Sequence, residues 1–188
     1  MSYLTREQLE QLGLKEVGAN VKISAKASLY NCGRISIGSN VRIDDFCVLS
    51  AGEGGIDIGS YVHVAVNCLL VGAAKVTLGD FSGISSRVAI YSSSDDYSGN
   101  SLTNPTVPDE YTDRSHGDVT LGRHAIVGAG SVILPGVSIG DGAAVGALSL
   151  VTKNCEEFYI YAGNPAKKLK RRATKLLQLE HQFLNASN

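Results

Sequence analysis

Large aromatic and sulfur-containing side chains are scarce in this sequence. Its 188 residues include no Trp, four Phe and one Met. Because 44% of the residues are nevertheless hydrophobic, most of the apolar content is Val, Ile, Leu and Ala. We therefore expect a single domain whose core consists of thin layers of aliphatic side chains, without large aromatic rings at its centre.

Strong charge, long apolar runs and closely paired cysteines are also missing. The formal net charge is −1, which gives no indication of nucleic-acid binding. No run approaches about 18 apolar residues, and the N-terminus lacks the layout of a signal peptide, so we predict a soluble cytoplasmic protein. The four cysteines contain no Cys-x-x-Cys pair, and we expect Cys47 and Cys68 to be reduced core residues.

What the sequence does contain is a repeat of six residues. An aliphatic residue recurs at every sixth position late in the chain, at Leu121, Val127, Ile133, Ile139, Val145 and Val151. A small or branched residue stands four positions after each of the first five, and Gly often follows the aliphatic directly. The same period begins earlier at Ile37, Ile58 and Leu78, at intervals of 21 and 20 residues. Three hexads therefore make one coil.

Each hexad predicts a short strand and a turn, whose aliphatic side chain points inward and stacks on its equivalents in adjacent coils. The small residue fits the corner, and we expect the Gly to adopt backbone conformations closed to other residues. Without the break at 92–118, the repeat makes about six coils. The predicted divisions are an N-terminal cap at 1–16, a β-helix at 17–153 and a C-terminal helical segment at 154–188.

The two open ends of such a stack need caps. Thr5 and Gln8 predict a capping box for a short helix that ends near Gly13. Asn164-Pro165 predicts the start of a C-terminal helix, with Asn as N-cap and Pro in the first helical position. Its apolar stripe would close the last coil or pack on another subunit. The residues of this stripe are Leu169, Ala173, Leu176, Leu177 and Phe183.

The hexad pattern resembles that of the hexapeptide-repeat acyltransferases, and the resemblance covers nearly the whole chain. It implies an all-β fold, a left-handed parallel β-helix with a protruding loop and a C-terminal α-helix, which usually assembles as a homotrimer. It also implies acyl transfer from acetyl-coenzyme A or another acyl-coenzyme A, without a metal, at sites between subunits.

The repeat is interrupted at residues 92–118, and long insertions into regular folds are more often functional than structural. This break carries six acidic residues and one Arg, a net charge of −5 with His116 neutral. In the family, a loop at this place folds over the active site. Sugar O-acetyltransferases of the family often carry a His at its start, whereas this chain has Ser-Ser-Ser-Asp-Asp at 92–96.

The segments SSSDDYSG and LTNPTVP resemble the nucleotide-sugar N-acyltransferases that act on 4-amino-4,6-dideoxy sugars for surface polysaccharides such as O-antigen. The resemblance implies direct attack of the sugar amine on the thioester. A neutral amine needs a carboxylate to orient it and accept its proton, which Asp95, Asp96 and Glu110 can supply. The alternative is a sugar O-acetyltransferase with His116 as general base. Further candidates for binding the acceptor are Ser85, Ser86, Ser94, Tyr97 and Asn104.

Coenzyme A in this family runs along the late coils. We expect small residues there to admit its pantetheine arm, namely Gly128, Ala129, Gly146 and Ala147. Its phosphates require cations, and a cluster of Lys and Arg follows the last coil. The candidates for phosphate contacts are Lys153, Lys167, Lys168 and Arg171.

Two other functional classes remain open. A zinc enzyme of the γ-carbonic-anhydrase type shares the fold but needs three His, two of them closely spaced. The four His of this chain, at 63, 116, 124 and 181, form no close pair. A non-enzymatic β-solenoid scaffold is the second class, and it would require neither the acidic break nor the basic cluster.

Overall fold

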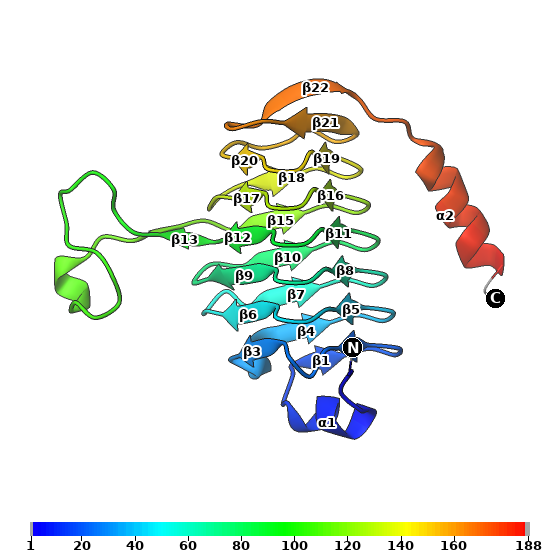
Figure 1. The fold of residues 1–188 in the computed structure, drawn as a ribbon, viewed down its shortest axis with the longest axis horizontal. Coiled ribbons are helices and arrows are strands. Elements are labelled where there is room, and N and C mark those ends of the chain that lie inside the picture. The colour runs from blue at the N-terminus through cyan, green and yellow to red at the C-terminus, as the bar shows by residue number, and fades with distance from the viewer. Residues whose placement is uncertain (1, 187–188) are drawn as a thin grey trace.

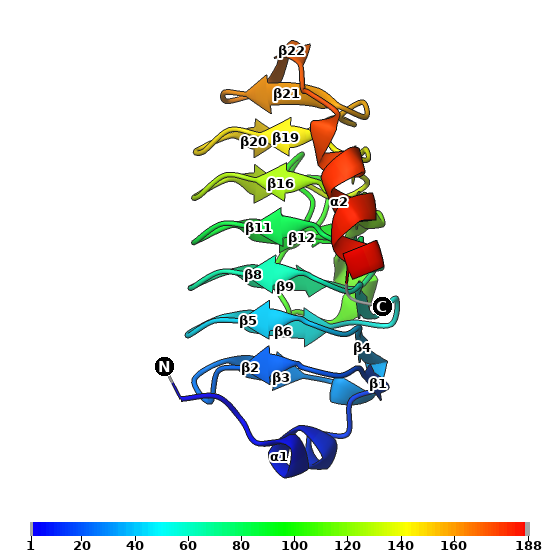
Figure 2. The same ribbon diagram turned by 90° about the vertical axis from the view of Figure 1, so that its right-hand side faces the viewer.

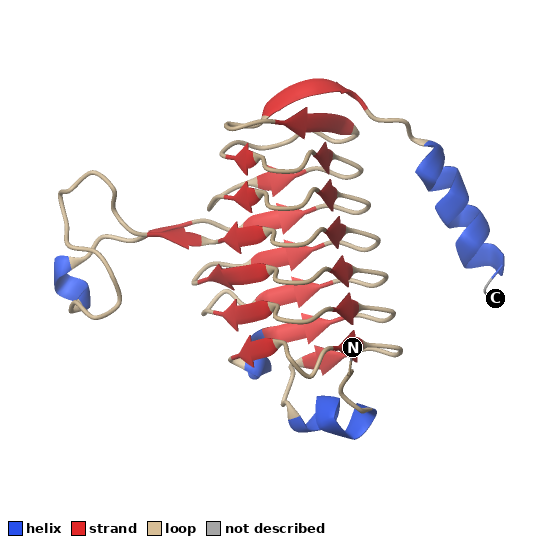
Figure 3. Cartoon of the chain, viewed as in Figure 1, coloured by secondary structure: helices blue, strands red, loops and turns tan. Residues whose placement is uncertain are grey.

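The computed structural model describes residues 2–186 and shows a stack of coils whose sides form three sheets of parallel strands, one of which ends in a single antiparallel strand (Figures 1 and 3). The first sheet contains β1 (Glu16–Val17), β4 (Ile35–Ile37), β7 (Ile56–Ile58), β10 (Val76–Leu78), β15 (Val119–Leu121) and β18 (Ser138–Ile139). The second sheet contains β2 (Lys22–Ile23), β5 (Arg42–Ile43), β8 (His63–Val64), β11 (Gly83–Ile84), β16 (Ile126–Val127), β19 (Ala144–Val145), β21 (Tyr159–Ala162) and β22 (Lys167–Arg171). The third sheet contains β3 (Ser28–Tyr30), β6 (Val48–Ala51), β9 (Leu69–Gly72), β12 (Ala89–Tyr91), β17 (Val132–Ile133) and β20 (Leu150–Val151).

The predicted fold class, a parallel β-helix with a protruding loop and a C-terminal helix, is confirmed. The prediction of about six coils was slightly low, because the stack has about seven turns. The additional turn is formed by residues that come after the last hexad in the chain. Cys155 forms a bridge with Ile139, and β21 pairs in parallel with β19.

The core is a set of aliphatic columns running up the inside of the stack. Every hexad aliphatic from Leu121 to Val151 is at most 3% exposed, as are the earlier repeats that begin at Ile37, Ile58 and Leu78. The parallel register explains this burial, because it places equivalent aliphatic residues of successive coils side by side. Val76, for example, pairs with Ile56 in the coil before it and with Val119 in the coil after it. The pairing of β10 with β15 also shows that the segment at 92–118 leaves and rejoins the stack without shifting the register.

The glycines that follow the hexad aliphatics have a different role from the one we expected. At Gly38, Gly59 and Gly128 the backbone φ is not positive, but an added Cβ would lie 2.4–2.8 Å from atoms of the next coil. These glycines therefore permit close stacking of coils. The left-handed conformations occur at the corners, mostly in larger residues, as in the ladder Asn20, Asn40, Tyr61, Phe81 and His124.

This close stacking leads to a stability prediction. Gly38→Ala would place a methyl group 2.7 Å from the carbonyl carbon of Gly59, so we expect it to lower the free energy of unfolding by about 1–3 kcal/mol. Gly33→Ala is a matched control, because a Cβ there meets only the carbonyl oxygen of Gly13, at 3.9 Å. Its effect should stay within about 0.5 kcal/mol. Urea titration measures both variants, and equal losses would contradict the stacking argument.

The N-terminal cap is the predicted one. Helix α1 (Arg6–Gln11) begins at the capping box of Thr5 and Gln8, and Gly13 follows it with a φ of 68°. The prediction of a C-terminal helix starting at Asn164-Pro165 was wrong, because that dipeptide forms a turn between β21 and β22. Strand β22 folds back antiparallel onto β21 and covers the open sheet edge. Pairing the backbone groups of this edge is more favourable than the helix that the spacing of apolar residues predicted.

The C-terminal helix, α2 (Lys175–Ala186), begins after the end of β22 and runs back along the side of the stack (Figures 1 and 2). It packs against the corner between the first and second sheets. Phe183 meets the ring of Tyr61 edge-on, with centroids 5.4 Å apart, and Glu180 lies 2.6 Å from Nε2 of His124. Strand β22, and not this helix, closes the last coil.

Candidate active site

The interruption of the repeat starts and ends as a two-stranded stem that leaves the stack (Figure 1). Strand β13 (Ser93–Ser94) pairs antiparallel with β14 (Ser115–His116), so Ser93 lies opposite His116. Beyond the stem, the chain forms an excursion that contains the 3-10 helix η2 (Asp109–Tyr111). The two ends of the excursion are therefore held together at the surface of the stack.

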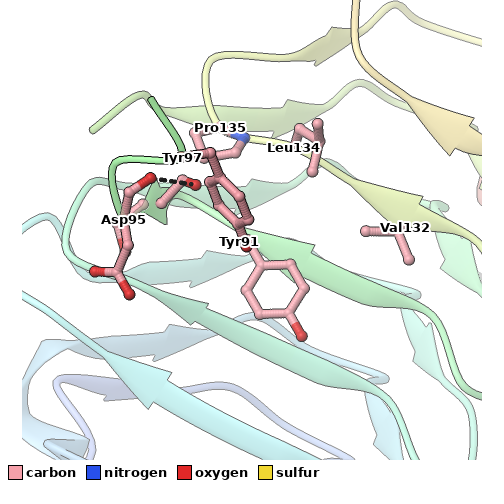
Figure 4. Close-up of a pocket in the computed structure, with 8 residues that line it drawn as sticks. Tyr91, Asp95, Tyr97, Val132, Leu134 and Pro135 are labelled. Atoms are coloured by element: carbon pink, nitrogen blue, oxygen red, sulfur yellow. Dashed lines mark hydrogen bonds between the residues drawn. The ribbon is translucent and has the colours of Figure 1, made fainter. Parts of the chain in front are cut away.

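A pocket of about 420 Å³ lies where this stem meets the third sheet (Figure 4). Residues Val132, Leu134 and Pro135 of β17 and its turn form one side of it, and Tyr91 at the end of β12 forms another. The excursion contributes polar groups from Ser93, Ser94, Asp95 and Tyr97. Ser94 donates a hydrogen bond from its hydroxyl to the carbonyl oxygen of Asp95, at 3.2 Å. The pocket thus combines an apolar wall with a single carboxylate.

Asp95 is held by an arginine from the far end of the excursion. Nε of Arg114 lies 3.8 Å from Oδ1 of Asp95, and its Nη2 donates to Asp109 at 3.0 Å. Arg114 therefore connects the two arms of the stem electrostatically. Sequence reasoning counted Arg114 only as one charge, although a lone cation among six acidic residues was a usable signal.

Asp96, the neighbouring carboxylate, points into the excursion and away from the pocket lining. It accepts hydrogen bonds from the backbone of Ser98, Asn100 and Ser101 at 2.7–3.0 Å, and from the Ser101 hydroxyl. The bonds from Ser98 and Ser101 hold the pKa of Asp96 far below its usual range. Its lone pairs are thus occupied in shaping the turn at 96–101.

The remaining predicted residues of the excursion do not line the pocket. Glu110 borders a separate hollow inside the excursion, beside Tyr111. Asn104 accepts hydrogen bonds from the backbone and the hydroxyl of Thr106 and so stabilises a turn at the excursion's tip. His116 is exposed on the stem. Of the four residues predicted to accept a proton in the reaction, Asp95 alone lines the pocket.

Ser85 and Ser86 form the corner between β11 and β12, and they border a second hollow of about 260 Å³. This hollow opens on the outer face of the second sheet. The other residues that line it are His63, Ala65, Gly83, Ile84 and Ile126. The hollow and the pocket at the stem belong to the same coil, that of β11 and β12. They lie on adjacent faces of the stack.

A buried carboxylate that sequence reasoning missed, that of Asp44, contacts His63 at the edge of this hollow. Asp44 is 5% exposed and accepts from Nε of Arg42 at 2.6 Å, and it lies 2.9 Å from Nε2 of His63. Burial raises the pKa of Asp44, but the hydrogen bonds from Arg42 and His63 outweigh it and leave the pKa below its ordinary value. The parallel register of β5 and β8, which pairs Arg42 with His63, creates this cluster.

The candidate coenzyme residues of the late coils lie on the surface side of the stack. Gly128 has a structural reason to be Gly, because a Cβ there would lie 2.4 Å from the backbone nitrogen of Ala147. At Gly146 an added Cβ would lie 3.0 Å from that of Ala162. Ala129 is half-buried, and Ala147 is exposed at the following corner.

The candidate cations lie on a strand and a turn, and not on the predicted helix. Lys168 pairs with Glu156 at 2.7 Å and lies 3.6 Å from the ring centroid of Tyr159, whose hydroxyl accepts from Arg171. Lys153 and Lys167 are exposed, and no ion pair involves either within residues 2–186. These two are therefore available to an anionic ligand.

Across residues 2–186, no group of three or more His, Cys, Asp and Glu side chains is arranged to hold a metal ion. Neither helix within this range is long and apolar enough to span a membrane.

Comparison with known proteins identifies the family. Residues 117–153 match the family model described as bacterial transferase hexapeptide (six repeats). The chain is 56% identical over 183 residues to an Escherichia coli dTDP-4-amino-4,6-dideoxy-D-glucose acyltransferase, covering 97% of this chain and 95% of that protein.

Among solved structures, it matches AntD, an N-acyltransferase from Bacillus cereus, in complex with dTDP and 3-hydroxybutyryl-CoA. The TM-score is 0.96 and the identity 48%, covering 100% of this chain and 98% of AntD. A serine-to-cysteine variant of AntD with dTDP-4-amino-4,6-dideoxyglucose and coenzyme A matches with a TM-score of 0.95 and 47% identity, covering 98% of each chain. The shared fold, and a sequence identity of 56% that extends over 97% of the chain, place this chain in the family of hexapeptide-repeat acyltransferases.

Proposed function

We propose that this acyltransferase moves an acyl group from acyl-coenzyme A to the 4-amino group of dTDP-4-amino-4,6-dideoxyglucose. The observation that carries the proposal is the pocket at the stem, which presents one carboxylate, that of Asp95, and no His among its lining residues. Transfer to a hydroxyl needs a general base, whereas a neutral amine attacks a thioester directly. The relative from Escherichia coli and the AntD complex with the amino sugar support the same acceptor.

In this mechanism Asp95 orients the amine and accepts its proton. The nitrogen lone pair attacks the thioester carbonyl, a C–N bond forms and the C–S bond breaks. The departing thiolate takes up the proton that Asp95 accepted, directly or through water, so that Asp95 is again ionised and free coenzyme A leaves. Structures of AntD include variants of a serine and of an aspartate ten residues further along that chain. The pairs Ser85 with Asp95 and Ser86 with Asp96 have this separation here, and the pocket favours Asp95.

We further propose a homotrimer whose active sites form between subunits. The pocket at the stem and the hollow beside Ser85 and Ser86 open on adjacent faces of one coil. Three-fold packing would bring the pocket of one subunit against the hollow of the next. The coenzyme would follow the late coils, past Gly128, Ala129, Gly146 and Ala147, with its phosphates near Lys153 and Lys167. Because acyl-coenzyme A and nucleotide sugars are cytoplasmic metabolites, we place the reaction in the cytoplasm, in the synthesis of surface polysaccharide such as O-antigen.

A thiol-release assay with acetyl-coenzyme A tests the reaction. We expect release with dTDP-4-amino-4,6-dideoxyglucose and none above background with the corresponding 4-hydroxy sugar. Release with the hydroxyl sugar would instead support O-acetylation with His116 as general base. Absence of release with both sugars and several acyl-coenzyme A donors, together with no binding of coenzyme A, would favour a scaffold.

A further inference from the structure

Two segments project from the stack at different corners of the same coil. The excursion leaves between β12 and β15, at the corner that joins the third sheet to the first. Helix α2 lies at the corner that joins the first sheet to the second, where Phe183 meets the ring of Phe81 edge-on, with centroids 6.3 Å apart. Figure 1 shows the two segments on opposite sides of the stack at a similar height.

The third corner, between the second and third sheets, exposes large apolar side chains. Phe46, between β5 and β6, is 55% exposed, and Leu148, between β19 and β20, is 77% exposed. This corner also joins the face that holds the pocket at the stem to the face that holds the hollow beside Ser85 and Ser86. In the proposed trimer, a threefold axis beside this corner would cover both apolar side chains and bring pocket against hollow.

This packing determines what lies at the outer end of each subunit interface. The third sheet of one subunit faces the second sheet of the next, and both faces begin at the axis. The third sheet ends on the outside at the corner with the excursion, whereas the second sheet ends at the corner with α2. The excursion of one subunit therefore leaves its stack beside α2 of its neighbour.

Both segments present apolar side chains that their own stack leaves exposed. In the excursion, Tyr97, Leu102 and Tyr111 are all more than half exposed. In α2, Leu179 is more than half exposed and Leu177 slightly less so. Contact between the two sets would remove these side chains from water, which stabilises an interface in proportion to the apolar area covered.

The charges of the two segments also favour this contact. The excursion carries a net charge of −5, whereas residues 153–175, which lead into α2, contain seven Lys and Arg against two Glu, a net charge of +5. Glu180 is the one acidic residue within 175–186. It accepts from Arg123 and lies 2.6 Å from Nε2 of His124, so its charge faces the stack. The outer face of the helix therefore presents no carboxylate to the acidic excursion.

We infer that the outer face of α2, with Leu177 and Leu179, is the docking surface for the excursion of the neighbouring subunit. This inference rests on the trimer of the proposed function. Because the excursion carries Asp95, α2 positions the carboxylate of the neighbouring active site without touching the substrate. Leu177 and Leu179 are thus positioning residues for a site in another subunit.

Chemical cross-linking tests the contact. A variant with Leu102→Cys and Leu179→Cys is treated with a short bis-maleimide and separated under denaturing conditions. We expect covalent dimers and trimers in about tenfold higher yield than in the parent protein or in either single variant, because docking raises the local concentration of the two thiols. Leu102→Cys with Leu169→Cys is the matched control, since Leu169 is similarly exposed but lies on β22.

Steady-state kinetics at saturating acyl-coenzyme A test the effect on the site. We expect Leu179→Gln to lower kcat/KM for the amino sugar about fivefold, because apolar contact is lost, and to change the affinity for coenzyme A by less than about twofold. Leu169→Gln makes the same chemical change and should alter kcat/KM by less than about twofold. Amides of residues 97–113 should also exchange faster in Leu179→Gln, which a role confined to the helix would not cause.

Light scattering supplies the mass of the native assembly and separates the outcomes. A trimer without cross-links above the control, or equal kinetic effects of Leu179→Gln and Leu169→Gln, would overturn the inference and leave the proposed reaction. A monomer that still releases thiol would overturn the trimer together with the inference. Cross-linked trimers that release no thiol with the amino sugar would remove the proposed acceptor only.

Discussion

Replacing Asp95 by Asn is expected to lower the turnover number about a hundredfold while the affinity for coenzyme A changes by less than about twofold. Asn keeps the size of the side chain but cannot accept the proton of the attacking amine. Asp95 is the one carboxylate among the residues that line the pocket, and it lies 3.8 Å from Arg114. The turnover number comes from thiol release at saturating substrates, and the affinity comes from titration of the free enzyme.

The adjacent Asp96 provides a matched control with the same chemical change. Its carboxylate is occupied by backbone and hydroxyl groups of the turn at 96–101. We expect Asp96→Asn to speed amide hydrogen exchange in this turn and to affect turnover less than Asp95→Asn does. Glu110→Gln and His116→Ala should retain most of the activity, since neither residue lines the pocket. Full activity of Asp95→Asn, or its loss in His116→Ala, would move the chemistry to another group.

The double replacement Lys153→Ala and Lys167→Ala is expected to weaken coenzyme A binding by about tenfold or more and to leave the fold intact. Both ammonium groups are exposed and take part in no ion pair within the described residues, so they can approach the phosphates without losing a partner. Titration calorimetry measures the affinity, and circular dichroism checks the fold. The affinity of the parent protein should also fall more steeply with salt than that of the double variant.

A second pair of lysines controls for net charge. Lys15 and Lys22 are exposed at the opposite end of the stack, so replacing both with Ala removes the same charge far from the late coils. Binding should then change by less than about twofold. Equal weakening in both double variants would mean that net charge alone attracts the coenzyme. Lys168 is a poorer choice for this test because it already pairs with Glu156 and lies over Tyr159.

The sequence alone was sufficient for the repeating part of the fold. A six-residue period places one aliphatic side chain on the inside of every short strand, and residues such as Ile84, Ile133 and Val151 are buried for that reason. The capping box of Thr5 and Gln8 was also predictable, because its hydrogen bonds join residues only three apart. Local and periodic interactions leave a direct signature in the order of residues.

The candidate site was only partly predictable. The interruption of the period located the excursion, and its acidic content drew attention to Asp95 and Asp96. Which of the two lies in the pocket depends on how the turn at 96–101 folds, and that turn closes around one carboxylate. The cluster of Asp44 and His63 joins residues on neighbouring coils, so no local pattern indicates it.

What the sequence by itself determined is the β-helix, its aliphatic columns and the place where the chain leaves the stack, because each follows from a spacing of a few residues. Only the tertiary structure decided the rest. It showed that β22 closes the stack, because an unpaired sheet edge competes with helix formation at 167–171. It showed that most repeat glycines prevent collisions between coils, while Gly83 leaves a hollow, because that difference depends on what the next coil places opposite each glycine.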